Sequence, residues 1–99
     1  MRYASFSEFY PYYLSEHRDR TNRRLHFVGS GTSLLIAATA LVLREPAGLL
    51  LALLVGYGCA WIGHFYFERN RPATFRHPLH SFAGDWVMFR DILVGRIPF

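Results

Sequence analysis

Two long apolar runs, neither of which contains an acidic residue or an arginine, limit what this chain can fold into. They cover residues 25–43 and 47–67 and are separated only by Arg44, Glu45 and Pro46. At about 1.5 Å per residue, each run forms a helix about 30 Å long, the thickness of the hydrocarbon core of a bilayer. A soluble helical hairpin is the alternative, but a chain of 99 residues with 18% charged side chains leaves little polar sequence to cover it. We therefore predict two transmembrane helices.

The short turn between the runs predicts an antiparallel hairpin with both termini on one side of the membrane. All arginines except Arg44 lie on that side, and the chain contains no lysine. By the positive-inside rule, we expect an integral membrane protein with both termini in the cytoplasm, where the arginines meet anionic lipid head groups. A nucleic-acid partner is not expected, because the arginines flank apolar spans and no binding motif accompanies them.

The N-terminal flank predicts an interfacial helix over residues 5–17. Ser5 and Glu8 have the spacing of a capping box, and aromatic residues recur after them at helical intervals. Pro11 lies within this segment, and we expect it to kink the helix or break its first turns.

The C-terminal flank predicts a second amphipathic helix over residues 82–94. Phe82, Trp86, Phe89 and Leu93 fall at helical spacing, and Gly95 follows as a residue suited to end the helix. The predicted fold is therefore all-α: a single membrane domain over residues 1–99, made of a transmembrane hairpin with flanking interfacial helices.

Small residues recur at three- and four-residue spacing in both apolar runs. Such residues let membrane helices approach closely, although glycine and alanine are also common in membrane spans generally. The residues are Gly29, Ser33 and Ala37 in the first run, and Gly56, Ala60 and Gly63 in the second.

The hairpin brings five histidines to one face of the membrane. His26 opens the first span, His64 closes the second, His17 precedes the first, and His77 and His80 follow the second. A single histidine here is ordinarily an interfacial ring bonded to lipid or water. Several converging imidazoles, however, could hold iron, zinc, copper or manganese. Taken together, the histidines predict a metal site.

Neighbouring residues add detail to this candidate site. His64 and Glu68 are four residues apart on one helical face, so they are either two ligands or a ligand and its orienting carboxylate. His77 and His80 flank Pro78 in a loop or at a helix start and form a further candidate pair.

Motifs of several common enzyme classes are missing. The sequence holds no H-E-x-x-H, no glycine-rich phosphate loop and no G-x-S-x-G. His17-Arg18-Asp19 matches part of the facial triad of 2-oxoglutarate oxygenases, but no strand-rich sequence surrounds it to build their fold. Hydrolase, kinase and dinucleotide-dependent activities are therefore not expected.

Two motifs resemble those of a known membrane family. The segment EHRDRTNRRLH contains H-x4-N-x3-H, and GHFYFERNRPATF contains GH-x2-FE followed by PA. These segments are similar to the iron-dependent 2-hydroxy fatty acid dioxygenases, and the similarity extends over nearly the whole chain. The resemblance implies an enzyme that uses Fe(II) and O2 to remove one carbon from a 2-hydroxy fatty acid.

The resemblance also implies roles for the matching positions. His17, His26 and His64 match as metal ligands, and Asn22 and Glu68 match as catalytic positions that orient ligands or substrate. Three neutral histidines leave positions on the metal where a 2-hydroxy acid and O2 could bind.

Arginines at the same end of the hairpin are candidates to bind the substrate carboxylate. Such a contact suits the bidentate geometry of a guanidinium group at the head-group level. The candidates are Arg23, Arg69, Arg71 and Arg76.

Two other functions remain open at this point. His26 and His64 could be axial ligands of a haem, or the chain could be a non-catalytic hairpin that shapes membranes or binds a partner. Because two spans are few for an enclosed active site, we also consider a homo-oligomer.

Overall fold

The computed structural model describes residues 3–99, and over that range its regular structure is helical throughout, which confirms the predicted all-α fold. The elements are α1 (Phe6–Ser15), α2 (Arg20–Leu43), α3 (Ala47–Ile62), η1 (Gly63–Glu68), η2 (Ala73–Phe75) and α4 (Pro78–Leu93). The segment η1 is a π-helical turn that continues α3, and η2 is a short 3-10 helix.

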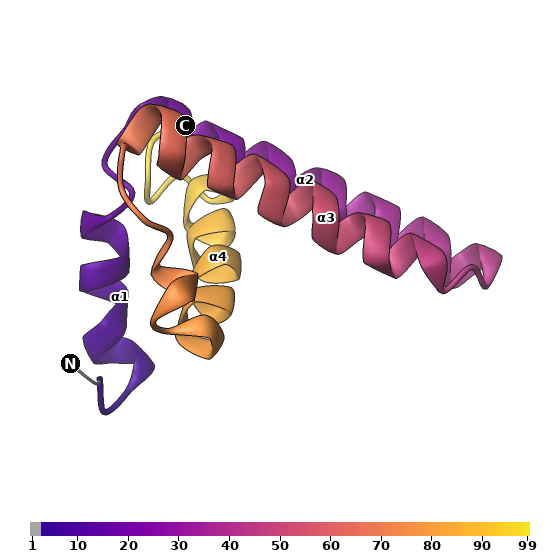
Figure 1. Cartoon of the computed structure of the whole chain (residues 1–99), viewed down its shortest axis with the longest axis horizontal. Coiled ribbons are helices and arrows are strands. Elements are labelled where there is room, and N and C mark those ends of the chain that lie inside the picture. The colour runs from indigo at the N-terminus through magenta and orange to yellow at the C-terminus, as the bar shows by residue number, and fades with distance from the viewer. Residues whose placement is uncertain (1–2) are drawn as a thin grey trace.

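Helices α2 and α3 form an antiparallel hairpin, and α1 and α4 lie crosswise to it at the end opposite the turn (Figure 1). Arg44 adopts a left-handed conformation (φ 56°) that ends α2, and Pro46 immediately precedes α3. The helical stretches Arg20–Leu43 and Ala47–Glu68 contain 24 and 22 residues, and each includes an 18-residue window with a mean hydropathy of 1.6. Both are therefore long and apolar enough to cross a membrane.

Helices α2 and α3 leave large apolar side chains exposed along the hairpin. Leu35, Val42 and Leu50 are 72%, 80% and 61% exposed, whereas the core helices of a soluble protein bury such side chains. A continuous apolar surface of this kind indicates contact with a membrane or a partner.

The helices begin earlier than the apolar runs suggest. Helix α2 starts at Arg20 rather than at residue 25, because the Asp19 carboxylate accepts a hydrogen bond from the backbone N–H of Asn22 (3.0 Å) and caps the helix. Helix α4 starts at Pro78 rather than at residue 82, with the proline in the first turn, where its missing N–H has no cost.

The N-terminal helix has the predicted cap. The Ser5 hydroxyl accepts a hydrogen bond from the Glu8 N–H (3.3 Å), and the Glu8 carboxylate accepts one from the Ala4 N–H (3.1 Å). Pro11 lies inside α1 without interrupting it. Pro11 and Ser7, whose carbonyl loses its helical partner, are both on the exposed face, where that carbonyl can be solvated.

The buried core lies between α1 and α4. Phe9 and Tyr13 of α1 pack with Met88 and Ile92 of α4 and with Ala73 of η2. A close approach of the two helices requires a glycine on α4, because a Cβ atom at Gly84 would lie 2.9–3.1 Å from the Tyr13 ring.

Helix α4 turns its acidic residues inward and much of its aromatic face outward. Asp91 is 7% exposed and accepts a hydrogen bond from the Tyr10 hydroxyl (2.8 Å), whereas Phe82 is 45% and Leu93 65% exposed. Asp85 also faces the hairpin, where it lies beside His26 of α2 at the end opposite the turn.

Candidate metal centre

Three histidines from separate segments meet where the helices converge. His17 follows α1, His26 lies in the second turn of α2, and His64 lies in η1. Their ring centroids are 4.5 to 5.0 Å apart, and each residue is at most 5% exposed. One ring nitrogen from each lies within 4.8 Å of the other two, so the trio could hold a single metal ion.

Hydrogen bonds fix the tautomers of His17 and His64. The His17 Nδ1 lies 2.6 Å from the Tyr13 carbonyl oxygen, which can only accept, so this nitrogen carries the proton. The Asn70 amide donates to the Glu16 carbonyl (3.0 Å), so its oxygen accepts from the His64 Nδ1 (2.7 Å). In the neutral rings, both Nε2 atoms therefore carry lone pairs.

Those two Nε2 atoms lie only 2.9 Å apart. Two lone pairs at this distance repel each other unless a proton or a metal ion supplies positive charge between them. Burial, together with the neighbouring His26 and His64, holds the pKa of His17 well below its ordinary value. His17 is therefore neutral near pH 7, which favours a metal ion over a shared proton.

His26 completes the trio with the same pattern. Its Nδ1 lies 3.6 Å from a carboxylate oxygen of Asp85, slightly beyond hydrogen-bond distance, and its buried Nε2 has no hydrogen-bond partner among residues 3–99. The Tyr13 hydroxyl donates to the same Asp85 oxygen, and burial and the Asp85 charge raise the Tyr13 pKa well above its ordinary value, so Tyr13 stays a donor. Histidine ligands commonly bond a carboxylate or carbonyl through the nitrogen that does not bind metal.

Asn22 and Glu68 join the start of α2 to the end of η1. One Glu68 carboxylate oxygen accepts from the Asn22 side-chain amide (3.0 Å) and from the Asp19 N–H (2.8 Å). Asn22 is fully buried, and Gly63 leaves it room, because a Cβ atom there would overlap the Asn22 side chain. The pair thus sets the spacing between the segments that carry His26 and His64.

The backbone at the end of the second span delivers Asn70 to His64. The π-helical turn ends at Arg69, which has a left-handed conformation (φ 60°), and the Asn70 N–H then bonds the His64 carbonyl oxygen (3.1 Å). Π-helical turns are rare and occur frequently at functional sites.

The structure does not bring His77 and His80 to this centre. Both rings pack among aromatic residues of the N-terminal segment, where the ring centroid of Phe9 lies 5.3 Å from that of each histidine. The group of potential ligands identified among residues 3–99 contains neither of them.

The arginines predicted to bind a carboxylate do not line the cavities at the histidines. Arg69, Arg71 and Arg76 are exposed, and Arg23 donates to the backbone carbonyls of Arg18 (3.1 Å) and His17 (3.5 Å). None of the four lines either cavity that adjoins the three histidines in the described part of the chain.

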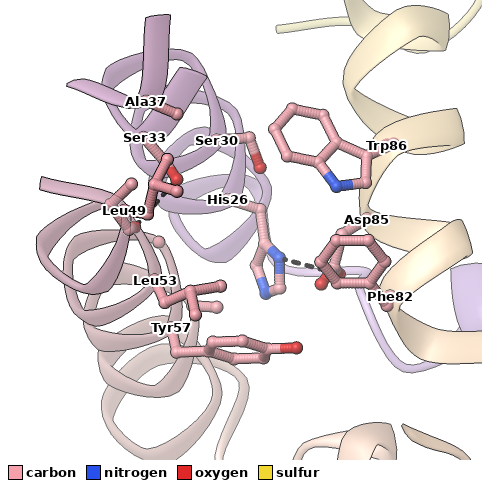
Figure 2. A pocket seen from close by; sticks show the side chains of 13 residues that line it. His26, Ser30, Ser33, Ala37, Leu49, Leu53, Tyr57, Phe82, Asp85 and Trp86 are labelled. Atoms are coloured by element: carbon pink, nitrogen blue, oxygen red, sulfur yellow. Dashed lines mark hydrogen bonds and ion pairs between the residues drawn. The ribbon is translucent and has the colours of Figure 1, made fainter. Parts of the chain in front are cut away.

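Two cavities adjoin the histidines. A small one of about 10 Å³ is bordered by all three rings. A larger groove of about 280 Å³ runs from His26 between the hairpin and α4 (Figure 2). His26, Tyr57 and Asp85 border both, so the groove begins at the candidate metal centre.

These residues fit a metal ion. Three imidazoles, two of them with tautomers fixed by hydrogen bonds, suit iron, zinc, copper or nickel and leave coordination positions open. A haem between His26 and His64 fits poorly, because the His17 ring contacts both rings and the cavity at the trio is far smaller than a porphyrin.

Sequence reasoning missed three side chains of this centre: Tyr13, Asn70 and Asp85. Asp85 had a detectable signal, because it is an acid on an aromatic helix that follows the histidine motifs. Asn70 had none, since its contact with His64 depends on the left-handed turn at Arg69.

The comparison with protein families matches the chain over residues 3–97 to the family described as 2-hydroxy-palmitic acid dioxygenase Mpo1-like. The chain belongs to this family, which confirms the resemblance seen in the sequence. Neither a curated protein nor a solved structure gives a significant match.

Proposed function

We propose that this member of the Mpo1-like family is an Fe(II)-dependent dioxygenase that removes one carbon from 2-hydroxy fatty acids. The observation that carries the proposal is the buried trio of His17, His26 and His64, in which two lone-pair nitrogens face each other at 2.9 Å. The family description, which names a 2-hydroxy-palmitic acid dioxygenase, supplies the reaction and the substrate class.

The protein's own residues prepare the ligands. The Tyr13 carbonyl and the Asn70 side chain accept from the Nδ1 atoms of His17 and His64 and direct their Nε2 atoms toward each other, and Asp85 lies near the Nδ1 of His26. Asn22 and Glu68 act as positioning residues that fix the distance between the two spans. A bound ferrous ion would supply the open coordination positions and the redox chemistry that a reaction with O2 needs.

The charge of the ion also matters for substrate binding. The cavities at the trio are lined by Asp85 but by no arginine in the described part of the chain, so a bound divalent ion would be the source of attraction for a carboxylate there. Arg23, Arg69, Arg71 and Arg76 lie at the same end of the molecule and remain candidates for attracting the acid or anionic lipid to that end.

We further propose that the hairpin spans a membrane with both ends of the chain at the cytoplasmic face. The arginine asymmetry supports this orientation, and the crosswise placement of α1 and α4 suits helices that lie along the interface (Figure 1). A homo-oligomer remains a prediction.

The test is O2 consumption by protein purified anaerobically in detergent and loaded with Fe(II). We expect uptake with 2-hydroxypalmitic acid and a product one carbon shorter by mass spectrometry, and none with palmitic acid, which lacks the hydroxyl. Uptake that is equal for both acids, or absent for both in iron-loaded protein, would refute the proposed reaction.

A non-catalytic hairpin is the competing function, and the same preparation tests it. Protein that binds no metal and consumes no O2 would support that alternative.

A further inference from the structure

The groove beside His26 adjoins the candidate metal centre, but holding a metal ion does not explain it. Residues of α2 and α3 form one wall, and Phe82, Asp85 and Trp86 of α4 form the other (Figure 2). Its volume of about 280 Å³ is close to the lower end of the range for small-ligand pockets.

The groove is polar at one end and apolar along the rest. His26, Ser30 and Asp85 lie at the inner end, and the buried His26 Nε2 there has no hydrogen-bond partner in the part of the chain that the structure describes. Farther along, the Ser33 hydroxyl already donates its hydrogen bond to the Ala52 carbonyl (2.8 Å), so it does not need a polar group of the ligand. A ligand that fits this distribution has one polar end and a long apolar remainder.

Small side chains make the groove narrow and long. Ala37, Ala52, Gly56 and Ala60 line it, so the space beside them is left open by the absence of larger side chains. His26 and Ala37 are eleven residues apart on one helix, which gives the groove a length of about 16 Å. An extended hydrocarbon advances about 1.25 Å per carbon, so about 13 carbons fit along this length.

The rim of the groove faces the surroundings of the hairpin. Leu49, Leu53 and Phe82 on its edges are 40%, 48% and 45% exposed, and the first two belong to a helix long and apolar enough to cross a membrane. An acyl chain could therefore enter sideways from the bilayer while its polar end reaches the histidines.

We propose that this groove binds the acyl chain of the 2-hydroxy acid, and that Ala37, at its outer end, limits the chain length that binds tightly. The inference rests on the proposed function, because the substrate's polar end is assigned to the metal centre. The estimated length approaches that of the palmitic chain named in the family description.

The test uses Trp86, which lines the groove, as a fluorescent reporter in protein loaded with Zn(II), which supplies a divalent charge at the trio without reacting with O2. The only other tryptophan is Trp61, so the Trp61→Phe variant leaves Trp86 as the single emitter. A 2-hydroxy acid brominated along its chain should quench Trp86 saturably in detergent, and unbrominated 2-hydroxypalmitic acid should reverse the quenching. A brominated phospholipid should quench it weakly and should not be displaced by the acid.

Chain length is tested with Ala37→Leu, and Ala38→Leu is the matched control. Ala38 is the exposed neighbour and does not line the groove. Each methylene kept out of an apolar site costs about fourfold in affinity. We therefore expect Ala37→Leu to lower the affinity for 2-hydroxypalmitic acid by about tenfold or more and to leave the affinity for 2-hydroxydecanoic acid nearly unchanged. Ala38→Leu should change neither affinity.

Several results would overturn the inference. One is equal effects of the two leucine variants, and another is quenching by the phospholipid that the hydroxy acid does not displace. A third result concerns self-association. If the brominated acid does not quench Trp86 and Ala37→Leu converts a dimer to a monomer, the groove binds a second copy of the chain instead.

The outcome is separable from that of the proposed reaction, because the quenching assay uses Zn(II)-loaded protein and requires no turnover. Length-dependent binding without O2 uptake by iron-loaded protein would refute the reaction and leave the groove assignment standing. O2 uptake that is insensitive to Ala37→Leu, without quenching, would refute the groove assignment alone.

Discussion

Replacing Asn70 with alanine should weaken metal binding without removing a ligand. The Asn70 side-chain oxygen accepts the Nδ1 proton of His64 at 2.7 Å, and the Asn70 amide is itself held by the Glu16 carbonyl. Without this acceptor, His64 can rotate or adopt the other tautomer, in which its Nε2 carries a proton and cannot bind metal.

Two independent estimates give the size of this effect. Leaving a buried donor without a partner costs about 1 to 3 kcal/mol, and His64 is only 2% exposed. Substitution of the group that orients a metal-binding histidine commonly lowers metal affinity about 10- to 100-fold, which corresponds to about 1.4 to 2.8 kcal/mol. We expect the dissociation constant of Asn70→Ala to rise within that range.

The assay is a titration with Co(II) as a spectroscopic probe, in competition with a chelator of known affinity. Arg71→Ala is the control, because Arg71 is exposed and does not contact the histidines in the structure. Both variants should keep the helical circular dichroism of the parent. If Asn70→Ala binds Co(II) as tightly as Arg71→Ala, then Asn70 does not orient His64 and the reasoning is wrong.

Three further outcomes follow from the structure. Gly63→Ala should lower the free energy of unfolding by about 1 to 3 kcal/mol, because its Cβ atom would lie 3.0 Å from the Asn22 Cγ. The control Gly58→Ala places its Cβ atom in open space and should leave the free energy of unfolding unchanged. Denaturation in detergent compares the two variants. Burial raises the pKa of Asp91, but hydrogen bonds from Tyr10 and Arg90 and the nearby positive charges lower it further, so its net pKa lies below 3.8. The ionised Asp91 therefore stabilises the fold above that pH and less as the pH falls below it, and Tyr10→Phe should destabilise the protein more at pH 7 than at pH 3 in thermal unfolding. Chelation should lower the unfolding temperature of metal-loaded protein, since an ion at 100 times its dissociation constant stabilises the fold by about 2.7 kcal/mol; a scan unchanged by chelator would contradict a metal held by the folded state alone.

Much of the fold follows from hydropathy and helix-capping chemistry. The two apolar runs predict the hairpin, and Ser5, Glu8 and Gly95 occupy the helix ends as expected, with Gly95 at a φ of 84°. Periodicity does not reveal the π-helical turn Gly63–Glu68, because its residues continue the apolar pattern of the preceding helix. The side of α4 that faces inward was also not predictable, since it depends on where α4 crosses the hairpin.

The three histidines of the candidate site were predictable, but their hydrogen-bond partners were not. An antiparallel hairpin places His26 and His64 at the same end, and His17 lies one short loop before α2. His77 and His80 share the same membrane face in the sequence analysis, yet packing against Phe9 holds them away from the trio. Membrane topology assigns a residue to a face, whereas side-chain packing decides which of the residues on that face meet.

The most direct test of the account is the metal content of protein purified anaerobically, compared between His64→Ala and His80→Ala. His64 lies in the buried trio, whereas His80 packs among aromatic rings outside it. The account predicts about one iron per chain in the parent and in His80→Ala, and little iron in His64→Ala. Equal metal content in the two variants, or no metal in the parent after incubation with Fe(II), would contradict it.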